Sequence, residues 1–276
     1  MSTGKLVGQL GLRLSYARWE PLGDPKAVVL LVHGYGEHMG RYLHVIEALN
    51  QRDIAVFALD HRGHGKSEGP RACVEKFEYF VHDLHLLLLK AKDAYPKQPF
   101  FMIGHSMGGL IATHYALGYE DQLEGLVLSG AALQIGDEVS ALLKAISKYL
   151  AKFVPNWGIL AGEENVLSRD PEVERRFKAD PLCYNGKLKA RMGYEMMIAS
   201  QDAFARMSQL SLPLLIMHGT ADRMTNPAGS QTLHQQARSQ DKTLKLWPDH
   251  FHEIFNEPQK EQVITFMLDW LDKRVV

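Results

Sequence analysis

Ser106 lies in surroundings that point to covalent chemistry. It is the centre of Gly-His-Ser-Met-Gly at 104–108, and Gly-x-Ser-x-Gly is the pattern of a sharp turn between a strand and a helix. Such a turn strains the serine backbone and exposes its oxygen, and the two glycines allow neighbouring backbone to approach closely. An apolar run precedes the motif and helical spacing of apolar residues follows it. The pattern therefore predicts that Ser106 is a nucleophile.

A serine nucleophile requires a base, and the base requires a group that orients it. Asp222 follows the apolar run LPLLIMHG, and His252 follows the next strand-like run, TLKLW. The order serine, aspartate, histidine is that of the triad of α/β-hydrolases. We therefore expect Ser106, Asp222 and His252 to act together. Spacing leaves alternatives open, with His250 as the base and Asp249 or Asp202 as the acid.

Backbone amides near Ser106 are candidates for an oxyanion hole. Attack on an ester creates negative charge on the carbonyl oxygen, which preorganised N–H groups stabilise. Met107 follows the serine at the start of the predicted helix, where the helix dipole favours an anion. The second donor is expected in the loop His33-Gly34-Tyr35-Gly36, after the first parallel strand. We predict that the amides of Met107 and Tyr35 form the hole.

Two further features receive no chemical role. The segment LDHRGHGKSEG, which begins at Leu59, has glycines and basic residues but not the spacing of a phosphate-binding P-loop. It is expected to brace the floor of the site. Cys73 and Cys183 are too few for a disulfide framework and do not have metal-ligand spacing. We predict no metal and no cofactor.

Strand-like and helix-like runs alternate along the chain and must position these residues. This rhythm predicts an α/β fold with a mostly parallel central sheet flanked by helices. The first 20 or so residues are expected to form an antiparallel edge. Strands are predicted to start at 27, 55, 99, 125, 212 and 243, and helices at about 41–52, 74–95, 107–119, 227–239 and 257–273.

The alternation of strands and helices stops between about 133 and 208, where helical patterns follow one another without a convincing strand. The segment is too long for a plain loop, so it is expected to be a helical cap inserted in a single domain of residues 1–276. Within it, residues 138–155 place apolar side chains on one helical face and lysines on the other. This pattern suits either a helix in a membrane surface or an ordinary cap helix packed on its own domain. The apolar face has Val139, Leu142, Leu143, Ile146, Leu150 and Phe153, and the basic face has Lys144, Lys148 and Lys152.

Bulk properties limit the function classes. The 276 residues include 46% hydrophobic and 23% charged residues, and the formal net charge is −1. This balance argues against a general nucleic-acid binder. No signal-peptide pattern and no membrane-length apolar run occurs. We expect a cytoplasmic protein with peripheral membrane contact through 138–155, and the sequence does not indicate an oligomeric state.

The motifs HGYGEHMGRY, DHRGHGKSEGP, GHSMGG, HGTADRM and FHEIFNE, in this order, resemble those of the monoacylglycerol lipases of the α/β-hydrolase superfamily. The resemblance runs from end to end and includes the insertion. It implies the α/β-hydrolase fold, the nucleophile, acid and base already named, and the same two oxyanion amides. The family's glycerol-contacting glutamate and arginine correspond to Glu37 and Arg41.

Two positions depart from the animal enzymes of that family. A small residue of their oxyanion loop is Tyr35 here, and a histidine that helps hold glycerol corresponds to Phe255. The resemblance thus implies a serine hydrolase of single-chain lipid esters, most of all monoacylglycerol. A lysophospholipase or broad carboxylesterase is the enzymatic alternative. A catalytically silent lipid-binding protein on the same fold is the alternative from another class.

Overall fold

A mostly parallel sheet forms the centre of the molecule. The computed structural model describes residues 1–134 and 141–275, and for residues 141–145 it describes the backbone alone. Within these residues the central sheet has eight strands in the order β1-β2-β4-β3-β5-β6-β9-β10. They are β1 (Ser2–Val7), β2 (Arg13–Trp19), β3 (Ala27–Val32), β4 (Ile54–Leu59), β5 (Phe100–His105), β6 (Gly125–Ser129), β9 (Leu214–Gly219) and β10 (Lys242–Trp247).

The strand pairing confirms the predicted sheet. Every pair from β4 to β10 is parallel, whereas β2 pairs antiparallel with both β1 and β4. The predicted antiparallel edge is therefore confirmed. Strands β3, β4, β5, β6 and β9 are buried along their whole length, because a parallel sheet is covered on both faces and its strands are continuously apolar.

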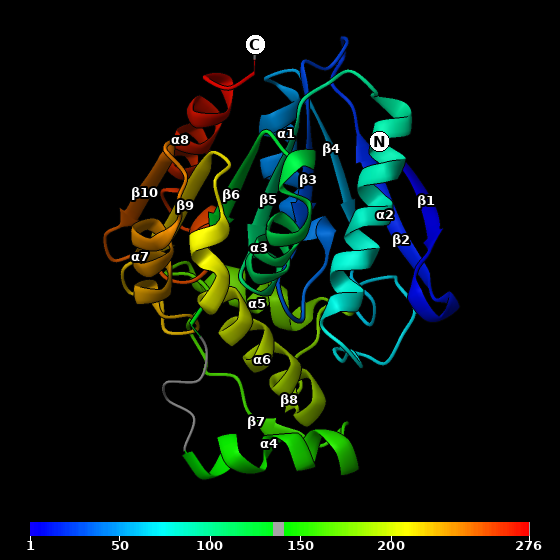
Figure 1. Ribbon diagram of the computed structural model, residues 1–276, viewed down its shortest axis with the longest axis vertical. Coiled ribbons are helices and arrows are strands. Elements are labelled where there is room, and N and C mark those ends of the chain that lie inside the picture. The colour runs from blue at the N-terminus through cyan, green and yellow to red at the C-terminus, as the bar shows by residue number, and fades with distance from the viewer. Residues whose placement is uncertain (135–140, 276) are drawn as a thin grey trace.

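Helices cover both faces of the sheet (Figure 1). The helices are α1 (Leu43–Asn50), α2 (Glu78–Ala94), α3 (Met107–Tyr119), α7 (Pro227–Gln236) and α8 (Lys260–Asp272). Short 3-10 helices occupy Gln9–Gly11, Met39–Tyr42, Glu120–Gln122, Met207–Gln209 and Ile254–Asn256. All five predicted helices are present, with ends within a few residues of those expected.

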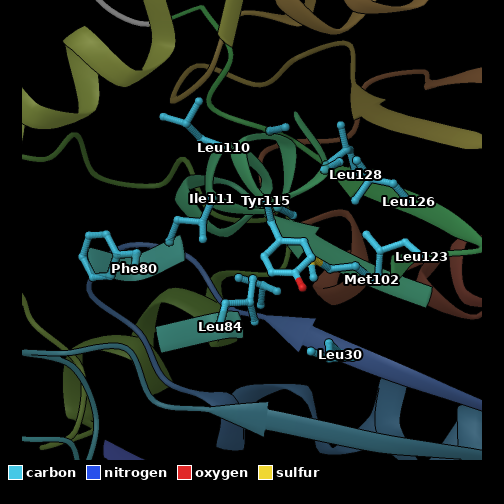
Figure 2. Packing of buried hydrophobic residues seen from close by; sticks show 14 of the residues in the cluster. Leu30, Phe80, Leu84, Met102, Leu110, Ile111, Tyr115, Leu123, Leu126 and Leu128 are labelled. Carbon is cyan, nitrogen blue, oxygen red and sulfur yellow. The ribbon is translucent and has the colours of Figure 1, made fainter. Parts of the chain in front are cut away.

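Alternate residues of β3 face two hydrophobic clusters. Val28 and Leu30 pack with residues of α2 and α3, whereas Val29 and Leu31 pack with residues of α1 and α8. Figure 2 shows the first cluster, in which Tyr115 of α3 lies among Leu84, Met102 and Leu30. Burial on both faces fixes the register of the central strand, because a slip by one residue would exchange the two faces.

The inserted segment leaves the sheet at the carboxyl end of β6 and returns before β9. It contains α4 (Ala141–Phe153), β7 (Gly158–Leu160), α5 (Pro171–Ala179), β8 (Leu188–Lys189) and α6 (Ala190–Arg206). In Figure 1, α4 lies at the end of the molecule farthest from the C-terminus, and α6 lies between it and the sheet. The helices were expected, but β7 and β8 were not, and they pair as a small antiparallel sheet. Of the predicted helix 138–155, Val139 and the other residues up to 140 lie outside the described residues, as do the side chains of Leu142, Leu143 and Lys144.

Among the helices that the structure describes, none combines the length and apolar character needed to cross a bilayer.

Candidate active site

Ser106 lies at the turn between β5 and α3 in a strained conformation. Its φ is 54° and its ψ is −120°, a region that residues with a Cβ rarely adopt. A Cβ on Gly104 would come within 2.6 Å of the carbonyl oxygen of Gly108, and a Cβ on Gly108 within 2.1 Å of that of Val32. Both positions therefore require glycine, and the tight crossing holds the strained serine in place.

Asp222 and His252 meet beyond the ends of β9 and β10. Nδ1 of His252 lies 2.8 Å from Oδ2 of Asp222, and both residues are buried. The hydrogen bond leaves Nε2 as the ring nitrogen that can exchange a proton with another group. The structure thus joins the base and the acid that the chain order predicts.

The alternative residues have other partners. Asp202 forms an ion pair with Arg206 on α6. The ring of His250 packs against Trp247, and its Nδ1 contacts the carbonyl oxygen of Pro248. Asp249 lies in the turn before His250, where its amide donates to Thr220. Among the residues described, none of the three alternatives pairs with either member of the His252–Asp222 couple.

The ring of His252 lies against the turn that carries Ser106. The ring of His105, the residue before the serine, is 4.7 Å from that of His252 between centroids. The amide of Ser106 donates to Ser129 across the strands at 3.0 Å. A Cβ on the next residue, Gly130, would come within 3.3 Å of Nδ1 of His252. These contacts bring the serine turn, the end of β6 and the histidine loop together.

Asp222 and His252 each shift the pKa of the other towards its charged form. Burial by itself raises the pKa of the Asp222 carboxyl, but the charge of His252 and hydrogen bonds from His218 and His252 outweigh it and lower that pKa well below its usual range. Burial lowers the pKa of His252, but the carboxylate of Asp222 outweighs burial and raises it. Asp222 is therefore ionised, and it stabilises positive charge on the histidine ring.

Asp222 accepts hydrogen bonds from more groups than sequence reasoning identified. Oδ1 accepts from the amides of Met224 and Thr225, and Oδ2 also lies 2.9 Å from Nε2 of His218. Thr225 Oγ1 lies 2.8 Å from Oδ2 as well. The signal in the sequence was the spacing of His218 and Asp222, four residues apart across the end of a strand.

The predicted oxyanion loop is held from below by Glu37. The amide of Gly34 donates to Oε1 of Glu37 at 2.6 Å, and the hydroxyl of Tyr42 donates to the same oxygen at 2.5 Å. Met107 is the first residue of α3, where N–H groups find no acceptor within the helix. A Cβ on Gly34 would come within 3.2 Å of the Cβ of Ser106, so the loop and the helix start both adjoin Ser106, as the predicted oxyanion hole requires.

The side chain of Tyr35 packs against the insertion. Its ring packs edge-on against Tyr184 of the insertion and against His64. The amide of Tyr184 donates to the carbonyl oxygen of Gly36 at 2.7 Å. The large side chain therefore joins the loop to the insertion and leaves the backbone donor unchanged.

Glu37 and Arg41 form a buried charge network with Glu253. Arg41 donates to Glu37 at 2.7 Å and holds both oxygens of Glu253 at 2.7 and 2.8 Å. Burial raises the pKa of Glu37, but the charges of Arg41, His105 and His33 outweigh it and lower that pKa to about 2. The network joins the oxyanion loop to the residue next to His252. Sequence reasoning did not identify Glu253.

The segment that begins at Leu59 braces the floor of the site, as expected. Asp60 accepts from the amides of Met39 and Lys66. The amide of His61 donates to Nε2 of His33 at 2.9 Å. Asp60 and His61 thus support the chain on both sides of Tyr35.

One cluster in the described chain has the donor atoms of a metal site. Nε2 of His38, a carboxylate oxygen of Asp180 and the sulfur of Cys183 lie within 4.8 Å of one another. However, Nδ1 of His38 accepts from the amide of Gly40 at 3.2 Å, so Nε2 carries the proton and donates it to Asp180 at 2.9 Å. Burial also raises the pKa of the Cys183 thiol to about 12. The arrangement is that of a hydrogen bond between core and insertion.

The insertion also contacts the histidine loop. The amide of Glu253 donates to the carbonyl oxygen of Leu167 at 2.7 Å. Glu257, which is buried, accepts from Nε of Arg169 at 2.8 Å and from the amide of Phe251 at 2.7 Å. The loop that carries His252 is therefore bonded to the insertion on both sides of the histidine.

Comparison with known families gives one matching model, described as serine aminopeptidase S33, over residues 23–259. Among curated proteins, the chain is 39% identical over 270 residues to the monoacylglycerol lipase of Mycolicibacterium smegmatis. The match covers 98% of this chain and 96% of that protein.

Two solved structures have the same fold. The monoacylglycerol lipase of Paleococcus ferrophilus superposes with a TM-score of 0.85 at 31% identity, covering 95% of this chain and 99% of that one. A soluble variant of the monoglyceride lipase of Saccharomyces cerevisiae, in complex with a substrate analogue, gives a TM-score of 0.88 at 26% identity, covering all of this chain and 95% of that one.

Proposed function

Because this chain belongs to the monoacylglycerol lipase family of the α/β-hydrolase superfamily, we propose that it hydrolyses monoacylglycerol to glycerol and fatty acid through an acyl-enzyme on Ser106. The observation that carries the assignment of residues is the 2.8 Å hydrogen bond between His252 and Asp222 beside the strained Ser106 turn.

In the proposed mechanism, Ser106 Oγ attacks the ester carbonyl while His252 takes its proton through Nε2. Asp222 holds Nδ1 and stabilises the imidazolium that forms. The amides of Tyr35 and Met107 donate to the oxyanion. His252 then protonates the departing glycerol, and a water molecule activated by the same histidine releases the fatty acid from Ser106.

We propose Glu37 and Arg41 as residues that act at the glycerol end of the substrate. The support is the family resemblance together with their place beneath the oxyanion loop. Both groups also have internal partners, so contact with glycerol would use whichever lone pairs and N–H groups the Glu253 network leaves open. Phe255 is buried and its side chain has no polar atom. Hydrogen bonds to glycerol would therefore come from other residues.

The proposed function is tested by comparing three lipids and one variant. The purified protein is expected to hydrolyse monoacylglycerol faster than diacylglycerol or lysophosphatidylcholine. Ser106→Ala is expected to abolish both turnover and labelling by a fluorophosphonate probe, because the nucleophile is lost. Faster cleavage of lysophosphatidylcholine would favour the lysophospholipase alternative, and a wild-type protein that neither turns over nor takes the probe would favour the silent binding protein.

We propose that the insertion at about 133–208 is a cap within a single domain of residues 1–276, and that it meets a lipid surface. Phe153 at the end of α4 is 70% exposed, and Trp157 just beyond it is 59% exposed. Together with Tyr149 and Val154 they line a shallow apolar groove of about 770 Å³. Lys148 and Lys152 are exposed on the same helix. Apolar groups beside lysines suit the interface of an anionic bilayer.

We also propose a cytoplasmic location. Both cysteines, Cys73 and Cys183, are free thiols, which is the state that a reducing compartment maintains.

A further inference from the structure

We propose that His218 is a positioning residue that holds the Asp222 carboxylate in the orientation that His252 requires. The inference rests on the proposed function, because it gives His218 a role in the same proton transfer. His218 has no contact with the ester in this scheme and acts through Asp222.

The geometry places two imidazoles on one carboxylate oxygen. Nε2 of His218 and Nδ1 of His252 lie 2.9 and 2.8 Å from Oδ2 of Asp222. His218 is wholly buried at the end of β9. On its other side, Nδ1 lies 2.7 Å from Oγ of Ser230 on α7. The ring is thus fixed at both nitrogens between the sheet and a helix.

Proton accounting fixes the direction of these bonds. The Asp222 carboxylate is ionised and can only accept, so Nε2 of His218 must donate to it. In the neutral ring, Nδ1 then has a lone pair that accepts the hydroxyl proton of Ser230. The bond to Ser230 therefore selects the tautomer that presents an N–H group to Asp222.

Donation from His218 has two consequences for the base. Together with the amides of Met224 and Thr225 on Oδ1, it resists rotation of the carboxylate away from His252. It also withdraws part of the negative charge that would otherwise act on the histidine. Without it, the carboxylate attracts the proton of the imidazolium more strongly, so the pKa of His252 rises. The charged and titratable groups that face His252 are Asp222, Glu253, Glu37 and His105, and His218 faces Asp222. A substitution at His218 replaces none of the four groups that face His252.

The test compares His218→Leu with His218→Gln in the full chain. The amide nitrogen of glutamine occupies the place of Nε2 and keeps the donor, whereas leucine removes it. The readouts are kcat/KM for p-nitrophenyl butyrate and the rate of fluorophosphonate labelling, each between about pH 5 and pH 9. For the leucine variant we expect kcat to fall about tenfold with little change in KM. We also expect the acidic limb of its pH profile of kcat/KM to move to higher pH by about half a unit or more. The glutamine variant is expected to restore most of the rate and the wild-type limb.

Two further variants keep the test decisive. Ser230→Ala removes the hydroxyl at Nδ1 at little cost in volume, and a smaller shift in the same direction is expected; it replaces His218→Leu if that variant does not fold. His114→Leu removes a half-buried imidazole on α3 that contacts Ala199, and its acidic limb is expected to stay in place. A purely structural role for His218 would lower the active fraction without moving the limb.

Two results would overturn this inference alone, provided that the wild-type protein is active. One is an acidic limb of the His218→Leu pH profile that does not move. The other is a glutamine variant as impaired as the leucine variant. A wild-type protein inert towards both reagents overturns the proposed function and this inference with it.

Discussion

At the scale of single residues, Arg41 joins the two loops on either side of Ser106. Its guanidinium bridges Glu37, which holds the amide of Gly34, and Glu253, which follows His252 in the chain. It also lies over the ring of Phe177 in the insertion, 4.9 Å from the centroid. One planar cation with several donors can satisfy all three contacts, and a lysine could not.

Replacing Arg41 is therefore expected to destabilise the fold as well as slow the reaction. Arg41→Met leaves two buried carboxylates without their cation, a change that typically costs about 3–5 kcal/mol. Chemical denaturation of the two proteins measures this cost as a loss in the free energy of unfolding. The control is Arg175→Met, which breaks an exposed pair with Glu172 and is expected to leave unfolding unchanged within error. Unchanged stability would contradict this structural role, and a raised KM without a loss of stability would leave Arg41 with only the proposed role at the glycerol end of the substrate.

The sequence indicated some of these residues and not others for a physical reason. Ser106, Asp222 and His252 follow strands, and the carboxyl ends of parallel strands meet at one edge of the sheet. Glu253 is next to His252 in the sequence, but its partner Arg41 is 212 residues away. Spacing along the chain does not say which way a loop side chain points, so this pair could not be identified.

At the scale of elements, the end of α4 and the turn after it carry the groove that we propose as a lipid contact. The double variant Phe153→Ser, Trp157→Ser removes two large exposed apolar side chains while keeping Lys148 and Lys152. Burying a large apolar side chain contributes about 1.5–3 kcal/mol, so the loss of two is expected to weaken vesicle binding by at least about tenfold. Co-sedimentation with vesicles of phosphatidylcholine and phosphatidylglycerol measures it.

Leu22 provides the matched control for this surface. It is fully exposed in the loop before β3. This loop leads into the amino end of a parallel strand, whereas the insertion follows the carboxyl end of β6. Leu22→Ser is expected to leave vesicle binding unchanged. Equal vesicle binding by the double variant and the wild type would contradict the proposed membrane contact. It would not bear on the proposed hydrolysis of dispersed substrate.

The elements that sequence patterns predicted are those long enough to show a period. The strands predicted to start at 27 and 125 begin there, and the others begin within two residues of the predicted position. Strands β7 and β8 have three and two residues, which is too short for alternation to appear. They pair with each other across the part of the insertion that contains α5, and such a long-range contact leaves no local pattern.

At the scale of the whole molecule, the topology gathers histidines around the site. Strand β3 lies between β4 and β5. His105 is the last residue of β5, and the loops that follow β3 and β4 carry His33, His61 and His64. The sequence predicted parallel strands but not this order, because pairing depends on contacts between distant segments. Burial lowers the pKa of all four, to about 3 for His64 and about 4 for His105. Nδ1 of His61 and Nε2 of His64 have no hydrogen-bond partner in the described chain.

These histidines should make the folded state sensitive to acid. In the unfolded chain each titrates near pH 6.5, so below that pH the unfolded state binds more protons and the free energy of unfolding falls as the pH falls. The slope is about 1.4 kcal/mol per pH unit for each group between its two pKa values. The raised pKa of His252 has the opposite sign, but it acts above pH 6.5 and so does not offset this loss.

Urea denaturation at several values between pH 7 and pH 5 tests the contribution of a single ring. In His64→Asn the amide nitrogen can replace Nδ1 as donor to the carbonyl oxygen of Arg62, and the new side chain does not titrate. The stability of this variant is expected to depend on pH less steeply than that of the wild type, by about 1.4 kcal/mol per unit below pH 6.5. His82→Asn, at an exposed position on α2, is expected to keep the wild-type slope. Parallel curves for His64→Asn and wild type would mean that the buried ring is not held neutral, and the acid sensitivity would then have to come from the carboxylates.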